Sequence, residues 1–337
     1  MSHLPNDRAQ VERRRFLRAV GACPVAWTAF SFAGRCEAAD VPMRILCSGP
    51  AGSIPDFIAR AIGEQFLSTL GQRVVVDNRA GAAGQLSVNA LKAAPTDGST
   101  LLLAQGAIAT VYPFLYSKLS YDPAVDLQPV SLAGEMPLAL AVGPAVPPEV
   151  ATIDDFLAWG RQHPAELNVG SPGSGTLPHL LEAMLFREAG LAWQHVAYSG
   201  GPPAVNDLVG GQIAALALPE GLLRQHHVTR RVRVLATSGA TRSTYLPDVP
   251  SFVEQGHQAL VVKEWFAFFA PGRVPSEIVS KTSAALAEAI ARPEVSVAFA
   301  QAGMTPASSS PSDLAARIVG EQRYWQPVLR TIDVHVD

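Results

Sequence analysis

Three glycine-rich turns carry the residue types from which this chain could build a binding site. They are "SGPAGSIPD" (48–56), "GSPGSGTLPH" (170–179) and "YSGGPPAVND" (198–207). Each follows an apolar segment that predicts a strand and opens a segment that predicts a helix. Glycine permits close backbone approach and positive φ, and the first N–H groups of a helix point towards an anion. The turns therefore predict a site where backbone N–H groups hold an anion.

Two other kinds of site use similar turns, a phosphate cradle and a nucleophile elbow. No turn matches Gly-x-Gly-x-x-Gly or Gly-x-x-x-x-Gly-Lys-Ser/Thr, and none contains lysine or arginine, so a doubly charged phosphate fits poorly. Ser171 and Ser174 fail the Gly-x-Ser-x-Gly spacing of an elbow. The histidines show no metal-ligand spacing. A carboxylate, which needs few donors, fits best, and a dispersed active site stays an open alternative.

The turns belong to a regular alternation of apolar and amphipathic segments. "MRILCS", "RVVVDN" and "STLLLAQ" predict strands in the first half, and "ELNVGS", "WQHVAYS" and "IAALALP" predict strands in the second half. Amphipathic segments such as "PDFIARAIGEQFLSTLG" and "LPHLLEAMLFREAG" lie between them and predict helices. This spacing predicts an α/β fold with parallel sheets.

Two apolar segments, 131–143 and 261–272, lie where the chain could cross between two such sheets. We therefore expect two α/β lobes joined by crossing hinge strands, with a ligand cleft between them. Lobe 1 would comprise residues 39–140 and 265–337, and lobe 2 residues 141–264. A single larger α/β domain is the alternative.

The N-terminal segment, 1–38, predicts an export signal. "ERRRFLR" precedes a short apolar run and the small-residue segment ending at Ala38, which is the order of a secretory leader. The pair Arg13 and Arg14 favours the twin-arginine route, with an ordinary secretory leader as the alternative. Cleavage after Ala38 would leave Cys47 as the one cysteine, and the product would be periplasmic.

Composition limits the function further. The chain has 337 residues, 48% hydrophobic and 16% charged, which excludes disorder. Its net charge is -3; the segment 1–38 holds six arginines against three acidic side chains, so the remainder carries -6. No block of like charge suggests a nucleic-acid partner.

Blocks along the whole chain resemble one known family. "GPAGSIPDFIARAIGEQF", "AAPTDGSTLLL", "LNVGSPGSGTLPHL", "HVAYSGGPPAVNDLVGGQI" and "EWFAFFAPGRVP" are similar, in order and spacing, to blocks of the substrate receptors of tripartite tricarboxylate transporters, the Bug family. The similarity covers residues 40–337. It implies a two-lobed periplasmic binding protein of the type II kind that captures a small organic acid and delivers it to a membrane permease. It also implies a monomer that is not an enzyme and needs no cofactor or metal.

Carried over by position, the resemblance implies four groups of ligand-binding residues. The first comprises Gly49, Pro50, Ala51, Gly52, Ser53 and Ile54. The second comprises Gln105, Gly106 and Ala107. The third comprises Ser171, Ser174, Gly175, Thr176 and His179, of which Ser174, Gly175 and Thr176 would hold one ligand carboxylate. The fourth comprises Tyr198, Gly200, Gly201, Pro203 and Ala204, with Glu220 at the far end of the pocket.

This chain departs from the family pattern at three places. Ser53 stands where the family often has a second glycine, and Gly106-Ala107 stands where it has hydroxyl residues. Leu218 stands where an acidic or amide residue is usual, with Glu220 beyond it. The far end of the pocket should therefore be less polar than in receptors for amino or hydroxy acids.

Simpler interpretations remain for several of these residues. Asp56 could complement the N-terminus of its helix, and His179 could be a satisfied helix-surface residue. Trp265 and Phe266 fit a buried hinge strand better than an aromatic platform. The alternatives to a transport receptor are a ligand-sensing periplasmic protein that acts on a signalling partner and an exported α/β hydrolase.

Overall fold

The computed structural model describes residues 42–332, 334 and 336, without the side chains of residues 67, 68 and 70. The expected export signal at residues 1–38, with its cleavage site, lies outside the described residues. Among the residues that are described, no helix is both long and apolar enough to cross a membrane.

In the described part of the chain, ten strands form one sheet with two portions that share a strand. The first portion has the order β2-β1-β3-β9-β4, with β10 on the other side of β4. Its strands are β1 (Met43–Cys47), β2 (Val74–Asn78), β3 (Thr100–Gln105), β4 (Leu127–Val142), β9 (Lys263–Pro271) and β10 (Thr305–Pro306). β1 is parallel to β2 and β3, whereas β9 is antiparallel to β3 and β4.

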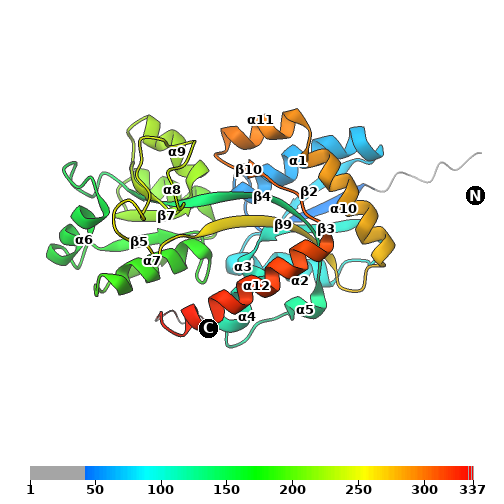
Figure 1. The fold of residues 1–337 in the computed structure, drawn as a ribbon, viewed down its shortest axis with the longest axis horizontal. Coiled ribbons are helices and arrows are strands. Elements are labelled where there is room, and N and C mark those ends of the chain that lie inside the picture. The colour runs from blue at the N-terminus through cyan, green and yellow to red at the C-terminus, as the bar shows by residue number, and fades with distance from the viewer. Residues whose placement is uncertain (1–41, 333, 335, 337) are drawn as a thin grey trace, which may run out of the picture. The chain divides into compact units, whose positions relative to one another are not determined.

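The second portion is built on the end of β4. Residues 138–142 of β4 pair with β7 (Ala215–Pro219), and residues 139–142 pair with β8 (Arg233–Thr237), both antiparallel. β7 is parallel to β5 (Asn168–Ser171), which is parallel to β6 (Gln194–Ala197). β4 leaves its pairing with β9 at Pro137, directly before the second portion begins. The 16-residue β4 therefore runs through both portions, as Figure 1 shows.

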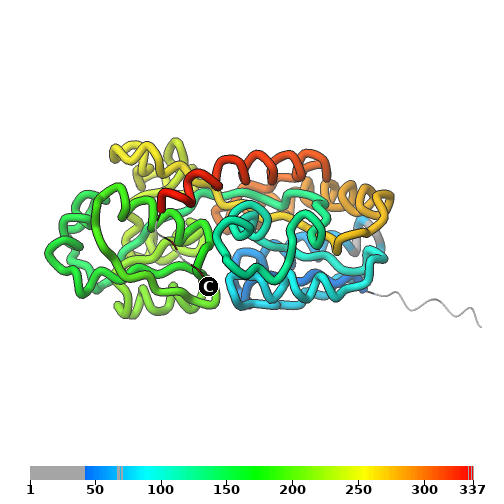
Figure 2. The backbone as a smooth tube through the Cα atoms, turned by 90° about the horizontal axis from the view of Figure 1, so that it is seen from below, coloured from blue at the N-terminus to red at the C-terminus, as the bar shows by residue number. Residues whose placement is uncertain are grey.

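Helices cover both faces of the first portion. One set consists of α1 (Ile54–Leu70), α10 (Ser276–Ile290) and α11 (Pro293–Gln301). The other set consists of α2 (Gln85–Lys92), α3 (Ala107–Thr110), α4 (Tyr112–Leu115) and α12 (Pro311–Leu329). The short α5 (Pro123–Asp126) precedes β4. Figure 2 shows α12, in red, running along the molecule towards the green segments of the second portion.

Alternation along the strands explains this two-sided cover. In β9, Phe266 and Phe268 belong to the core beneath α1 and α10, whereas Trp265 and Phe269 belong to the core on the other face. Successive side chains of a strand point to opposite faces, so a strand that is apolar at every position needs helices on both sides. Trp265 and Phe266 are 0% and 4% exposed, which confirms that these aromatic residues form a buried strand.

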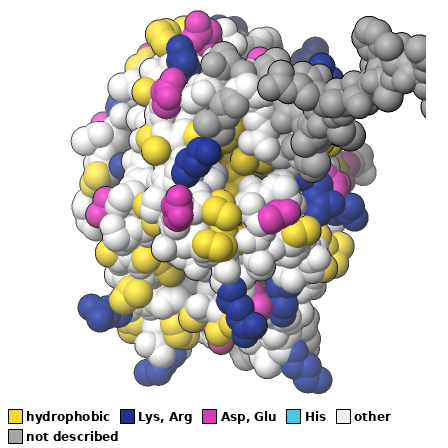
Figure 3. All heavy atoms as spheres, turned by 90° about the vertical axis from the view of Figure 1, so that its right-hand side faces the viewer, with side chains coloured by type: hydrophobic (Ala, Val, Ile, Leu, Met, Phe, Trp, Pro, Cys, Tyr) yellow, Lys and Arg dark blue, Asp and Glu magenta, His cyan; other side chains and the backbone are white. Residues whose placement is uncertain are grey.

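The second portion follows the same arrangement with its own helices. They are α6 (Ile153–Gln162), α7 (Leu177–Glu188), α8 (Gly201–Val209) and α9 (Glu220–Val228). Thr152 and Asp155 form a capping box that fixes the start of α6. The predicted alternation of strands and helices, and with it the α/β fold, is confirmed. The prediction of parallel sheets is wrong for β4 and β9, which are antiparallel to the strands they pair with. On the face in Figure 3, acidic and basic side chains lie interspersed among hydrophobic ones.

Candidate functional site

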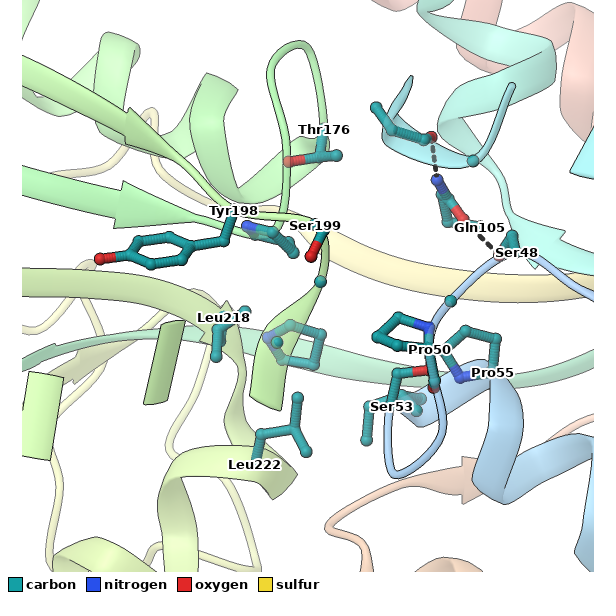
Figure 4. Close-up of a pocket in the computed structure, with 18 of the residues that line it drawn as sticks. Ser48, Pro50, Ser53, Pro55, Gln105, Thr176, Tyr198, Ser199, Leu218 and Leu222 are labelled. Atoms are coloured by element: carbon teal, nitrogen blue, oxygen red, sulfur yellow. Dashed lines mark hydrogen bonds between the residues drawn. The ribbon is translucent and has the colours of Figure 1, made fainter. Parts of the chain in front are cut away.

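A cavity lies at the carboxyl ends of the parallel strands, where open α/β sheets bind ligands. It encloses about 730 Å³ of empty space, part of it open to solvent. The first sheet portion contributes the turn after β1, the 3₁₀ turn η1 (Ala82–Gly84) with Gly81, and Gln105 at the end of β3. The second contributes residues of the turns after β5 and β6 and the β7–α9 junction, and β9 adds Glu264 and Phe266. Figure 4 shows the two sides facing each other.

The turn after β1 is held by side chains of its own helix and of β2. Gly52 has a φ of 79°, and its N–H donates to Oδ2 of Asp56 at 3.0 Å. Asn78 and Arg60 donate to the same carboxylate. Burial alone would raise the pKa of Asp56, but these hydrogen bonds outweigh burial and lower it. Asp56 therefore shapes the turn as a carboxylate, beyond complementing a helix terminus.

The turn after β5 is also held from within. The N–H of Gly175 donates to Nδ1 of His179 at 3.0 Å, and the Thr176 hydroxyl donates to the carbonyl of Gly173 at 2.7 Å. His179 is buried and stacks on His195 with ring centroids 3.6 Å apart. Burial, with repulsion from His195, lowers the pKa of His179 to about 3. His179 is therefore neutral at physiological pH and serves as an acceptor that fixes the turn.

The turn after β6 approaches the first sheet portion closely. Gly200 has a φ of 143°, and a Cβ atom at this position would lie 2.6 Å from Cδ of Pro50. The hydroxyl of Tyr198 donates to Asp207 at 2.8 Å, so Tyr198 offers mainly its ring to the cavity. Pro202 and Pro203 have no N–H, and the donors of this turn are therefore those of Ser199, Gly200 and Gly201.

Further contacts join the two sides around the cavity. The hydroxyl of Tyr116 donates to the carbonyl of Ser174 at 2.8 Å. A Cβ atom on Gly173 would lie 3.2 Å from that of Ala83. Together with the approach of Gly200 to Pro50, these contacts place turns of both sheet portions directly against each other.

The loop Gly81–Gly84 lines the cavity, although it is not among the predicted site residues. Ala82 and Ala83 have positive φ angles of 46° and 53°, which are uncommon outside glycine. Gln105 and Tyr112 both donate to the carbonyl of Ala83, at 2.7 and 2.8 Å, and hold it there. Its sequence signal is its position, since it follows a parallel strand that neighbours β1.

Nine of the expected site residues line the cavity: Gly49, Pro50, Ser53, Ile54, Gln105, Thr176, Tyr198, Gly200 and Gly201. The other expected residues lie outside the lining: Ala51, Gly52, Gly106, Ala107, Ser171, Ser174, Gly175, His179, Pro203, Ala204 and Glu220. The residues that line the cavity outside the four expected groups are Ser48, Pro55, Gly81, Ala82, Ala83, Gly84, Pro172, Ser199, Leu218, Pro219, Leu222, Glu264 and Phe266.

Packing explains why several expected residues lie outside the lining. Gly106 is pressed against Trp265, whose ring would lie 2.1 Å from a Cβ atom. Ser171 is fully buried and lies 2.8 Å from Nε2 of His195. Ala204 is fully buried in α8, and Glu220 is fully buried and accepts a hydrogen bond from Ser243. These residues support the turns from behind.

The cavity is weakly polar. Ile54, Leu218, Leu222 and Phe266 line it, and no lysine, arginine or histidine is among the described residues of its lining. No group of three or more His, Cys, Asp or Glu in the described part of the chain could hold a metal ion. Glu264, on β9, is the one acidic side chain among the lining residues that the structure describes.

The family model of the tripartite tricarboxylate transporter family receptor matches residues 58–334. The chain belongs to this family. It is 32% identical over 290 residues to Protein BugT of Bordetella pertussis, covering 86% of this chain and 88% of that protein. As a member of the Bug family, it is a periplasmic solute-binding receptor and not an enzyme.

Solved structures of related receptors have the same fold. The chain resembles MatC from Rhodopseudomonas palustris, solved with bound malate, with a TM-score of 0.80 and 27% identity over 86% of this chain and 98% of that one. It also resembles an R. palustris protein solved with adipate, with a TM-score of 0.81 and 26% identity over 86% of this chain and 96% of that one. The periplasmic-binding-protein fold is thus confirmed, and these two similar proteins were solved with carboxylates.

Proposed function

We propose that this receptor captures a small organic carboxylate in the cavity between the turns after β1, β5 and β6, and delivers it to a membrane permease of the tripartite tricarboxylate type. The observation that carries the proposal is the cavity itself. Its lining combines three glycine-rich turns with apolar side chains and contains no lysine or arginine among its described residues. Backbone N–H groups are then the natural partners of a carboxylate.

The donors available to a ligand differ from those first expected. The N–H groups of Gly52 and Gly175 are already bound to Asp56 and His179. The N–H groups of Ser199, Gly200 and Gly201 form no backbone hydrogen bond within the described part of the chain. We therefore place the ligand carboxylate at the start of α8, between Thr176 and Ser53, where ordered waters can complete its shell.

We further propose that the cavity opens and closes as two lobes move. Lobe 1 comprises residues 39–140 and 265–337, and lobe 2 comprises residues 141–264. Two backbone segments support this division: the shared strand β4, and the segment in which the chain returns from residue 260 into β9. Few segments would therefore have to bend when the lobes move. The contacts of Tyr116 with Ser174 and of Gly200 with Pro50 would then belong to the closed form. We expect the receptor to act as a monomer.

A thermal-shift screen of mono- and dicarboxylic acids tests the binding function. A ligand at about 100 times its dissociation constant stabilises the native state by roughly 2.7 kcal/mol, a shift of several degrees. The amide and methyl ester of each active acid should give no shift, because they lack the anion. Deletion of the gene should abolish uptake of the same acid. If no carboxylate shifts the melting temperature, or if the amides bind as tightly, the proposal fails.

A further inference from the structure

Most polar side chains of the cavity are already paired within the protein. The hydroxyl of Ser48 donates to Gln105, and Gln105 donates to the carbonyl of Ala83. The hydroxyls of Ser53 and Thr176 donate to backbone carbonyls of their own turns. These side chains therefore shape the cavity and leave few polar groups with which to distinguish one ligand from another.

Glu264 stands apart from these paired groups. It is one of the residues that line the cavity, it is only 3% exposed, and its Oε1 atom is buried without a hydrogen-bond partner. It lies two residues before Phe266 on β9, so both side chains point to the same face of the sheet, towards the cavity. A buried polar atom without a partner is costly, and a partner brought by the ligand would remove that cost.

No cation compensates Glu264 in the described structure. The ionisable groups that interact electrostatically with it are Glu321 on α12 and Tyr112 at the start of α4, and the residue paired with it on β4 is Met136. The nearby Arg317 is engaged by Glu135 and Glu321, and Lys263 lies 3.7 Å from Glu135. Burial, with repulsion from Glu321, raises the pKa of Glu264 to about 8. At neutral pH this side chain is thus a carboxylic acid that can donate a proton.

We propose that Glu264 is the specificity-determining residue of the cavity and recognises the second carboxylate of a dicarboxylic acid by sharing one proton with it. The inference rests on the proposed binding of a first carboxylate by the turns. Two carboxyl groups that share a proton carry one negative charge between them, as in the dyad of aspartic proteases. The hydrogen bond from a neutral acid to a carboxylate is short and strong. A cavity without cations can in this way hold the second carboxylate of its ligand.

Proton linkage predicts how the affinity for a diacid depends on pH. Below pH 8 the apo protein already carries the shared proton, so affinity for a diacid is nearly independent of pH there. Above pH 8 the proton must be taken up from solvent on binding, so affinity falls about tenfold for each pH unit. A ligand that brings an ammonium group to an ionised Glu264 would show the opposite trend.

Isothermal titration calorimetry with succinate, malate and adipate, each compared with its monomethyl ester, tests the inference. We expect at least one diacid to bind at least tenfold more tightly than its monoester at pH 7. Titration at pH 9 in two buffers of different ionisation enthalpy should reveal uptake of close to one proton per diacid. Monoesters that bind as tightly as the diacids would overturn the role of Glu264 while leaving the carboxylate-binding proposal standing.

Variants of Glu264 test whether this residue, and not another acidic group, causes the pH dependence of diacid affinity. Glu264→Gln keeps a donor and should keep diacid affinity at pH 7 within several-fold, without the fall above pH 8. Glu264→Leu should lose at least tenfold of diacid affinity and with it the preference for the diacid over its monoester. A cooperative thermal unfolding transition shows that the variant is folded.

The matched control is Glu220→Gln. Glu220 is likewise buried, with its pKa raised to about 7, but it lies outside the lining. This variant should retain the wild-type fall above pH 8. If Glu264→Gln retains that fall, or if Glu264→Leu binds diacids normally, the inference is wrong. Binding of neither diacids nor monoacids would instead count against the carboxylate-binding function itself.

Discussion

The N–H of Gly175 donates to Nδ1 of His179, one helical turn further along the chain. The sequence suggested that this N–H would hold the ligand, yet it holds the turn. Gly52 and Asp56 form the equivalent pair after β1. Both turns thus have an internal acceptor four residues on, which fixes their shape before any ligand arrives. Preorganisation of this kind lowers the entropic cost of binding.

Loss of the acceptor at His179 should destabilise the turn. In His179→Phe the N–H of Gly175 stays buried without a partner, which costs about 1 to 3 kcal/mol. Urea denaturation should report a free energy of unfolding lower by this amount. The control is His163→Phe on the end of α6, where the histidine is partly exposed and away from the cavity. Equal stability of His179→Phe and wild type would show that the hydrogen bond contributes nothing.

The stacked histidines predict a loss of stability in mild acid. Burial lowers the pKa of His195 to about 4, and that of His179 to about 3, from the ordinary value of 6.5. Between pH 6.5 and these lowered pKa values, the unfolded chain binds more protons than the folded chain. The free energy of unfolding therefore falls as the pH decreases below 6.5. Each histidine contributes a slope of about 1.4 kcal/mol per pH unit.

The variant His195→Gln should lose the contribution of His195 to the slope of the free energy of unfolding against pH. The free energy of unfolding, measured from pH 7 to pH 4.5, should then fall less steeply than in wild type by about 1 kcal/mol per pH unit. Buried Glu264 acts with the opposite sign over pH 4.5 to 8, but it is present in both proteins and cancels in the difference. Identical slopes would mean that His195 is not depressed in the folded state.

A side chain at Gly200 should keep the two sides of the cavity apart. The Cβ atom of Gly200→Ala would meet Cδ of Pro50 at 2.6 Å, in a backbone region that L residues rarely adopt. Affinity for the carboxylate found in the screen should fall at least tenfold. Gly190→Ala is the control, because its φ is also positive, at 58°, but nothing lies within 4 Å. Small-angle scattering that shows the same ligand-induced compaction in both variants would contradict this steric account.

The sequence predicted the α/β fold well because buried strands can be recognised as apolar runs in the local sequence. Apolar runs such as that of β1 are followed by glycine-rich turns and amphipathic helices, and the connection rules of α/β sheets then place the turns at one edge. The identity of the lining residues was less accessible. Whether Gly52 and Gly175 offer their N–H groups depends on where Asp56 and His179 point, and no periodicity reveals this.

Glu264 shows most clearly which features of the site the sequence could not predict. In the sequence it is one acidic residue at the start of an aromatic strand, and this position predicts an exposed strand end. Its burial depends on tertiary contacts such as its pairing with Met136 on β4, a strand more than 120 residues before it in the chain. The Gly81–Gly84 loop was missed for a similar reason, since Gln105 and Tyr112 hold it from a distance in sequence.

Export remains a prediction, because residues 1–41 lie outside the described structure. We expect the mature protein to begin near Ala39 and to be found in the periplasm. If the twin-arginine route is used, the double variant Arg13→Lys and Arg14→Lys should accumulate in the cytoplasm with its signal uncleaved. Cell fractionation and N-terminal sequencing check this. Normal export of the double variant would leave the general secretory route.

The hydrogen bond from Tyr116 to Ser174 predicts a link between closure and affinity. In Tyr116→Phe the closed form loses one hydrogen bond, worth about 0.5 to 1.5 kcal/mol, while the open form loses none. The closed population falls accordingly, so affinity should drop about twofold to tenfold although Tyr116 does not line the cavity. Tyr121→Phe is the matched control, since the hydroxyl of Tyr121 donates to the carbonyl of Ile108 within one side of the cavity. Tyr121→Phe should lower the free energy of unfolding but leave the affinity of the native protein unchanged. Titration calorimetry with the carboxylate found in the screen compares the two variants, and equal affinities would show that the Tyr116–Ser174 contact does not report on closure.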